Sequence, residues 1–111
     1  MKAKEFAEMC YAEKEIQLEE YMNGNESLVA KLKNDLALST EQEKILYKLV
    51  DTVLTDTYLT LLYALDGTAS LGNEKQENFK LYGEDGELVF DSGELEIATY
   101  EAFYENKKVK K

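Results

Sequence analysis

The 111-residue chain has no histidine, no proline and no tryptophan, and its one cysteine is Cys10. The absence of histidine excludes Ser-His-Asp and Cys-His catalysis, histidine acid–base chemistry and zinc sites that need imidazole. A single cysteine excludes an internal disulfide and thiolate metal clusters, and its place in an apolar helix pattern predicts a buried free thiol. Carboxylate, tyrosine and lysine side chains are what remains for an active site.

Several sequence motifs are missing as well. There is no glycine–lysine phosphate loop and no G-x-G-x-x-G fingerprint. No apolar run approaches the ~18 residues of a membrane helix, and the first five residues lack the following apolar core of a signal peptide. We therefore expect a cytoplasmic protein with no cofactor and no membrane partner.

The charge balance is strongly acidic, because 23 Asp and Glu residues face 13 lysines and give a net charge of −10. Such a field disfavours nucleic acid and anionic membranes as partners and favours a basic protein. It equally serves solubility, so a binding role and a purely solubilising role both remain open. Lysines concentrate at the C-terminus, where we expect residues 105–111 to form a frayed basic tail.

One long helix organises the predicted fold. Ser39 or Thr40 can cap its first turn, with Gln42 or Glu43 as the capping-box partner. Gly67 can close the helix in the left-handed conformation. No glycine or proline interrupts the segment between these caps, which favours a helix of about 26 residues over a strand.

The apolar pattern of this helix predicts different packing for its two halves. In the second half apolar side chains cover most of the circumference, so we expect that half to be enclosed on several sides. The first half has a single apolar stripe, which should be its buried side. The residues of this stripe are Ile45, Leu46, Leu49, Val50 and Val53.

Two shorter amphipathic helices precede the long one, at residues 2–22 and 28–38. Residues 68–78 follow it without a clear period, and both a plain connector and a functional loop remain open for them. The first two helices should pack through apolar residues, namely Phe6, Ala7, Met9, Cys10, Ile16, Leu18 and Tyr21 in the first and Leu28, Val29, Leu32 and Leu36 in the second.

Residues 78–92 predict a β-hairpin that turns at Asp85 and Gly86 and packs on the long helix. The acids at this turn superficially suggest calcium, but they lack the spaced ligands of a calcium loop, so no metal site is predicted. A longer loop over residues 83–86 is an alternative to the two-residue turn. With the two-residue turn, the expected pairs are Lys80–Asp91, Leu81–Phe90 and Tyr82–Val89.

A last helix is predicted to begin at Glu94. Its inner stripe would be Leu95, Ala98, Ala102 and Phe103, with Ile97, Tyr100 and Tyr104 beside it. The fold class that follows is α+β and mainly helical: three N-terminal helices with the third long and central, a β-hairpin, and a C-terminal helix. At this length we expect a single domain over residues 1–111.

Tyrosine is the most informative side chain for a binding role, because the chain has eight of them and no tryptophan. Tyrosine is common where an apolar surface meets water, including protein interfaces. Ordinary boundary positions are the alternative explanation for these tyrosines. The predicted binding patch joins the hairpin to the last helix through Tyr82, Glu84, Asp85, Glu96, Tyr100, Glu101 and Tyr104.

A second candidate pocket lies toward the end of the long helix. Asp56 stands among apolar residues near Tyr58, and a desolvated carboxylate is a site signature. Together with Asp66 and the loop at residues 67–72, it would serve a small-ligand binder or a carboxylate-based enzyme. The alternative is that Asp56 faces water, because acids are rarely buried unpaired.

The segment LYALDGTASLG at residues 62–72, followed by FKLYGEDGEL at residues 79–88, resembles small uncharacterised acidic bacterial proteins of the toxin-immunity type. The resemblance implies a cytoplasmic inhibitor that blocks a basic toxin by charge and shape. We therefore predict a non-enzymatic acidic binding protein with a basic protein partner. A self-associating module that pairs through its tyrosine-rich face, and the carboxylate-based binder or enzyme, are the alternatives; the chain can be a monomer or a homodimer.

Overall fold

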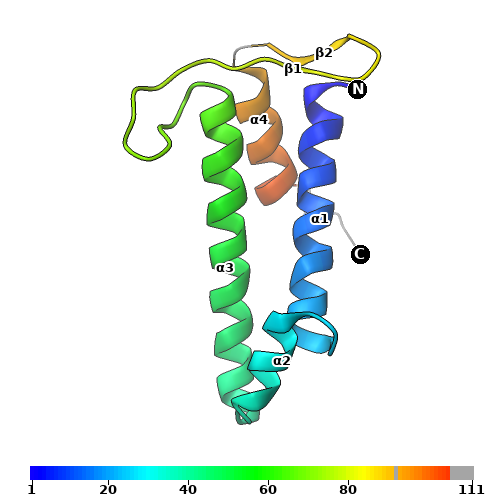
Figure 1. The fold of residues 1–111 in the computed structure, drawn as a ribbon, viewed down its shortest axis with the longest axis vertical. Coiled ribbons are helices and arrows are strands. Elements are labelled where there is room, and N and C mark those ends of the chain that lie inside the picture. Colours follow the sequence, from blue (N-terminus) through cyan, green and yellow to red (C-terminus); the bar gives the residue numbers. More distant parts are fainter. Residues whose placement is uncertain (92, 106–111) are drawn as a thin grey trace.

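The computed structural model describes residues 1–91 and 93–105. It confirms the predicted mainly helical α+β fold, with three N-terminal helices, a hairpin and a last helix (Figure 1). The predicted basic tail, apart from Glu105, lies outside the described residues. The elements are α1 (Ala3–Asn23), α2 (Leu28–Asp35), α3 (Thr40–Leu65), β1 (Leu81–Tyr82), β2 (Leu88–Phe90), α4 (Glu94–Tyr100) and a π-helical turn (Glu101–Glu105) that continues α4.

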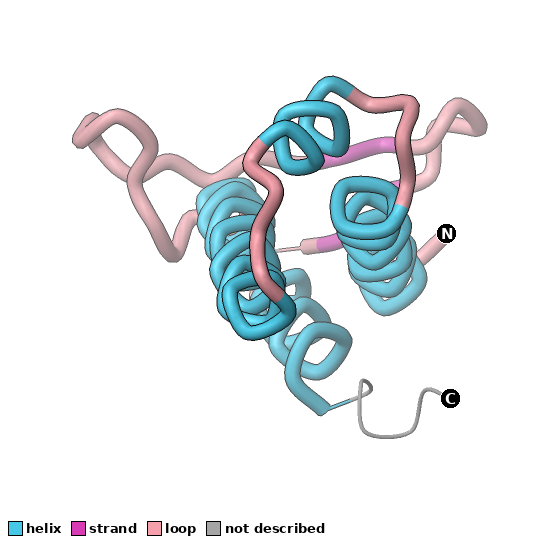
Figure 2. The backbone as a smooth tube through the Cα atoms, turned by 90° about the horizontal axis from the view of Figure 1, so that it is seen from below, coloured by secondary structure: helices cyan, strands magenta, loops and turns pink. Residues whose placement is uncertain are grey.

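The two long helices, α1 and α3, run antiparallel beside each other (Figure 1). At one end α4 packs against both of them, and at the other end α2 packs mainly against α1. Figure 2 shows α2 and α4 on opposite sides of the α1–α3 pair. We call the end with α4 and the hairpin the α4 end, and the opposite end the α2 end.

The caps of α3 form as predicted. Ser39 Oγ accepts a hydrogen bond from the Gln42 N–H at 3.2 Å, and Gln42 Oε1 accepts one from the Ser39 N–H at 3.0 Å. Gly67 follows the helix with a φ of +78°, which a residue with a Cβ adopts only at a cost. The local sequence therefore fixes both ends of the helix.

The hydrophobic core lies at the α4 end. Phe103 is 1% exposed, and its ring meets the ring of Tyr11 edge-on at 5.3 Å and lies 6.0 Å from that of Tyr58. The second half of α3 is enclosed only in part, because Leu61 remains 48% exposed. The buried cluster contains the whole predicted inner stripe of the last helix: it is formed by Ala3, Ala7, Tyr11, Leu59, Leu62, Val89, Phe90, Leu95, Ala98, Ala102 and Phe103.

The hairpin register is right for one predicted pair and wrong for another. Leu81 pairs with Phe90 as expected, but Tyr82 pairs with Leu88 and not with Val89, because a bulge lies between the two pairs. A bulge places an extra residue on one strand, which shifts every pair on its far side.

The longer-loop alternative describes the hairpin turn better. The Gly83 N–H donates to the Glu87 carbonyl at 2.9 Å, and the Gly86 N–H donates to the Gly83 carbonyl at 2.9 Å. The cover of the hairpin is wider than expected, since β2 has its main backbone contacts with α1. Its residues Val89 and Phe90 also belong to the buried cluster that contains Leu59 and Leu62 of the long helix. The contact with α1 forms because α1 begins directly beneath the hairpin (Figure 1), where Ala3 and Ala7 leave room for it.

The predicted packing of the α2 end is wrong for three of the five stripe residues of α3. Ile45, Leu49 and Val53 are 68%, 57% and 53% exposed, whereas Leu46 and Val50 are partly buried. Because α2 packs mainly against α1, it leaves the three exposed residues uncovered. The periodicity marks an apolar face, but it does not show whether the same chain supplies the element that covers it.

Several apolar side chains of α1 and α2 that were predicted to be buried are also exposed. The α1 residues that are buried recur at steps of three and four and include Tyr11 and Lys14 in place of the expected Met9 and Ile16. Cys10 is half-buried, and this burial raises the pKa of its thiol above the ordinary value of 9.0. The apolar residues predicted to be buried that are exposed in α1 and α2 are Met9, Ile16, Leu28, Val29, Leu32 and Leu36.

A buried lysine joins α1 to α3. Lys14 is 1% exposed, and its Nζ donates to Glu15 Oε2 and to Asp51 Oδ1, each at 2.7 Å. Burial opposes the positive charge, but the hydrogen bonds to Asp51 and Glu15 outweigh it and raise the pKa of the Lys14 ammonium. The lysine lies on the core-facing stripe of α1, and its charge is balanced there by Asp51 of α3 and by its neighbour Glu15.

This pair predicts a specific loss of stability at alkaline pH. A raised pKa means that the folded state holds the Lys14 proton more tightly, so its contribution is complete below the ordinary value of 10.5 and is lost as pH rises through the folded value. We expect Lys14→Met to lose less stability than the parent between about pH 9.5 and 11.5 in urea titrations. Lys31→Met, at an exposed lysine of α2, is the control and should follow the parent curve. Identical alkaline slopes for Lys14→Met and the parent would contradict the assignment.

Candidate functional site

A crevice of 350 Å³ lies between α3 and α4, and three carboxylates and two tyrosines line it. Acids next to aromatic faces attract cationic side chains, because the carboxylates are negatively charged and the faces of the rings have a negative electrostatic potential. We call this feature the α4 crevice. Its lining residues are Tyr63, Glu96, Ile97, Tyr100, Glu101 and Glu105.

Two more contacts define the tyrosines of this surface. The rings of Tyr100 and Tyr104 lie 5.1 Å apart, and the two side chains are 50% and 39% exposed. Burial raises the pKa of the Tyr63 phenol above 10.0, and the neighbouring Tyr104 and Glu96 add to this shift. Tyr63 is therefore a neutral hydrogen-bonding group on the α3 wall, and the exposed rings of α4 are open to a partner.

One buried carboxylate holds the two walls of the crevice together. Asp66, directly after α3, is 2% exposed. Its Oδ1 accepts a hydrogen bond from the Gly93 N–H and its Oδ2 accepts one from the Glu96 N–H, both at 2.8 Å. The carboxylate thus caps the free N–H groups at the start of α4 from another helix, where negative charge also suits the helix dipole. The position of Glu96 in the crevice depends on this contact.

The structure brings together the four predicted binding residues of the last helix. Glu96, Tyr100 and Glu101 line the α4 crevice, and Tyr104 contacts Tyr100 beside it. The sequence prediction did not include Tyr63 in this patch. No local pattern pointed to it, because Tyr63 reaches this surface through the contacts of Asp66 with Gly93 and Glu96, which are 27 and 30 positions away in the sequence.

The three predicted binding residues of the hairpin do not line the crevice. Tyr82 is 57% exposed, and Glu84 and Asp85 are exposed at the turn. Asp85 Oδ1 accepts a hydrogen bond from the Glu87 N–H at 3.0 Å, a contact that stabilises the turn itself. These residues form a separate acidic surface at the tip of the hairpin.

The alternative pocket forms only in part. Asp56 is exposed and lines an open hollow of 370 Å³ together with Leu71 of the predicted 67–72 loop, but neither Tyr58 nor Asp66 lines it. Tyr58 points instead toward α1, where its hydroxyl donates to Gln17 Oε1 at 2.8 Å, and Asp66 caps α4. Residues two apart on a helix lie about 200° apart around its axis, so Asp56 and Tyr58 do not converge on one ligand.

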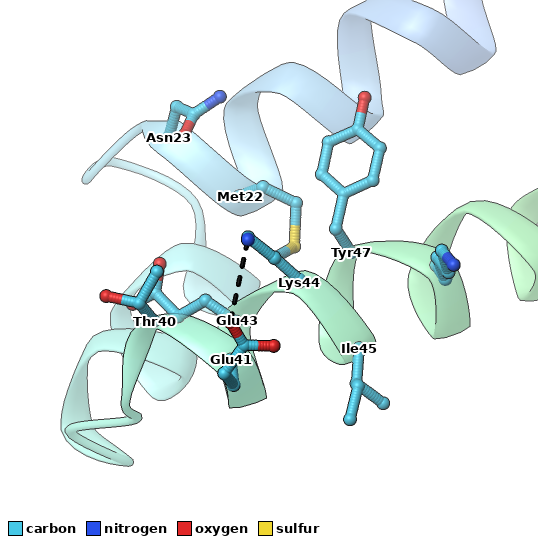
Figure 3. A pocket seen from close by; sticks show the side chains of 9 residues that line it. Met22, Asn23, Thr40, Glu41, Glu43, Lys44, Ile45 and Tyr47 are labelled. Carbon is cyan, nitrogen blue, oxygen red and sulfur yellow. Dashed lines mark ion pairs between the residues drawn. The ribbon is translucent and has the colours of Figure 1, made fainter.

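A hollow of 590 Å³ lies between the end of α1 and the start of α3 (Figure 3). Its charged lining consists of two acids and two lysines, and Lys44 Nζ lies 3.6 Å from Glu41 Oε2 across exposed surface. Balanced charge of this kind selects neither a cation nor an anion. The α4 crevice is therefore the better candidate for a charged partner.

Comparison of the chain with models of known protein families, with functionally described proteins and with solved structures gave no match. Within residues 1–91 and 93–105, no group of three or more Cys, Asp or Glu is placed to hold a metal ion. In the same part of the chain, no helix combines the length and the apolar content needed to cross a bilayer. Function therefore has to be argued from the site of this chain.

Proposed function

We propose that the protein is a non-enzymatic binding protein whose α4 crevice takes a basic segment of a protein partner. The observation that carries the proposal is the meeting of three carboxylates and two tyrosines in one crevice. This crevice belongs to the most acidic part of the chain, because residues 66–105 hold eleven of the 23 acids and only two of the 13 lysines. A basic partner is drawn toward that end of the molecule.

The lining of the crevice suits both the aliphatic stem and the charged head of a lysine or arginine side chain. Their aliphatic stems pack on apolar and aromatic surface, which Tyr100 and the 62% exposed Ile97 supply. Their charged heads then reach Glu96 or Glu101 and the face of a tyrosine ring. A segment with alternating basic and apolar residues fits this surface better than a purely charged one.

A protein of this kind acts by covering a basic surface of its partner, and it needs no catalytic residue for that. Inhibition is the activity that follows most simply, and the resemblance to toxin-immunity proteins supports it. A basic toxin present in the same cytoplasm is the partner that this proposal favours. Nucleic acid is disfavoured because the phosphate backbone carries the same sign of charge as the crevice.

Nuclear magnetic resonance maps the proposed site directly. The probe is a peptide of about 16 residues made of lysine and leucine, titrated into ¹⁵N-labelled protein. We expect the largest shifts at Tyr63 and at residues 96–105, and weaker binding as sodium chloride rises from about 50 to 500 mM, because salt screens the attraction. Shifts spread evenly over the acids of α1 and the hairpin would contradict the proposed site.

Matched charge variants separate the crevice from the general acidity of the chain. Glu96→Gln with Glu101→Gln is expected to weaken peptide binding about 3- to 30-fold, since each exposed charge pair contributes up to ~1 kcal/mol. The control is Glu84→Gln with Asp85→Asn, which removes the same charge from the hairpin and should leave the affinity within about twofold. If both double variants lost the same peptide affinity, the attraction would depend on net charge alone and the proposed site would be contradicted.

A further inference from the structure

The α2 end carries an uncovered apolar surface made by two helices. On α3, a ridge of three side chains stands out, namely Ile45, Leu49 and Val53, each more than half exposed. Beside it, α2 and α3 enclose a groove of 420 Å³. This α2 groove is lined by Val29, Leu32, Lys33, Asp35, Leu36 and Leu46.

The groove is strongly apolar at its centre. Leu32 is 56% and Leu36 is 60% exposed, and Leu28 extends the same face of α2 with 69% of its surface exposed. Leu46 forms the floor on the α3 side and lies three residues before Leu49 of the ridge, so the ridge and the groove adjoin. Adjoining exposed apolar residues of this kind are typical of an interaction site, whereas single exposed apolar residues are ordinary.

The charge around this surface differs from that of the rest of the molecule. Residues 27–53 contain four lysines and four acids and are neutral as a group. The strongest acidity lies in residues 66–105, at the α4 end, with eleven acids and two lysines, and residues 1–26 add seven acids and three lysines. A basic partner has no electrostatic reason to choose the neutral surface, whereas two copies of this chain can meet there with their acidic ends held apart.

A ridge next to a groove on one surface is also self-complementary. A two-fold axis between them places the ridge of each copy in the groove of the other, which is the isologous arrangement of most homodimers. The mixed charges at the edge, among them Lys33, Asp35 and Lys48, give such an interface an apolar centre and a polar rim.

We infer that the α3 ridge and the α2 groove form the interface of a two-fold symmetric homodimer. The interface completes the packing of the first half of α3, which the chain itself leaves open. It is separate from the α4 crevice, because none of its residues line that crevice. Each dimer therefore presents two acidic crevices.

Sedimentation velocity of the full chain tests the dimer, over protein concentrations from about 2 to 500 µM. We expect a monomer–dimer equilibrium whose dimer persists or strengthens as salt rises, because salt screens the repulsion between two chains of charge −10. Leu32→Asp in the groove and Leu49→Asp on the ridge are each expected to leave only monomer over this range. Both sites are exposed, so circular dichroism of the variants should match that of the parent.

Ile16→Asp is the matched control, because it adds the same charge at a 62% exposed apolar residue of α1 outside the interface. It should retain the parent equilibrium. A parent that stays monomeric up to about 500 µM would overturn the inference. A dimer that survives both Leu32→Asp and Leu49→Asp would also overturn it, and loss of that dimer in Tyr100→Asp would assign self-association to the α4 surface.

Discussion

Replacing Phe103 by alanine is expected to lower the free energy of unfolding by about 3–5 kcal/mol, the usual cost of truncating a buried phenylalanine. Phe103 is 1% exposed and its ring contacts Tyr11 of α1 and Tyr58 of α3. No other side chain of α4 and its continuation makes aromatic contacts to both long helices among the described residues. The variant should therefore loosen the whole α4 end, as measured by urea unfolding followed by circular dichroism.

The neighbouring tyrosine is the control for this effect. Tyr104→Ala removes a side chain of similar size that is 39% exposed and contacts only the exposed ring of Tyr100 among aromatic partners. Its cost should be about 1 kcal/mol or less. Because typical domains have only ~5–15 kcal/mol of stability, Phe103→Leu serves as a milder variant if Phe103→Ala does not fold. Similar losses for Phe103→Ala and Tyr104→Ala would contradict the assigned core.

Asp66→Ala is expected to cost about 1–3 kcal/mol, because it removes the acceptor of two part-buried N–H groups at the start of α4. The carboxylate is 2% exposed and accepts from the Gly93 and Glu96 N–H groups. Asp66→Asn keeps one acceptor oxygen and should lose less. Both variants should also weaken peptide binding, because Glu96 is positioned in the crevice through its backbone contact with Asp66.

The control for Asp66 is an acid within α3. Asp56→Ala removes an exposed carboxylate of α3 and should change the free energy of unfolding by about 0.5 kcal/mol or less. If Asp56→Ala were as destabilising as Asp66→Ala, the cross-helix cap would not be the cause. Peptide affinity measured on the folded fraction separates lost positioning of Glu96 from lost folding.

Features set by local chemistry were predicted correctly from the sequence. The caps at Ser39 and Gly67 gave α3 its observed bounds, Thr40–Leu65. The inner stripe of the last helix, including Leu95 and Phe103, is buried as expected. In each case the residues that decide the feature lie within a few positions of it, so the pattern is complete in the sequence.

Features set by distant partners were predicted less well. The exposed ridge at Ile45 and Leu49 has the spacing of a buried face, and only the placement of α2 against α1 shows that it is open. Lys14 is the opposite case, a charged side chain that is buried. The sequence does not show its burial, because its partner Asp51 is 37 positions away. Periodicity reports which side chains share a face, but it does not report what meets that face.

Of the predicted binding patch, the residues of the last helix lie together in the structure and the residues of the hairpin lie elsewhere. The tyrosines and acids of the last helix share one surface because they lie three to five positions apart on it, which the sequence shows. Whether the hairpin joins that surface depends on how β2 packs, and the contact of β2 with α1 keeps Tyr82 and Glu84 out of the crevice. Tyr63 enters it through the cap at Asp66, a contact between segments that are 27 and 30 positions apart.

The central claim is that the α4 crevice binds a basic segment while the α3 ridge and the α2 groove hold two copies together. The mass of the complex with the basic peptide tests this claim most directly. Light scattering of the parent protein with saturating peptide should give two chains of 12.7 kDa and two peptides. This result is expected because the α4 crevice remains exposed when the α3 ridge and the α2 groove are paired. A complex of one chain and one peptide would mean that the peptide and the second copy compete for one surface, and would contradict the account.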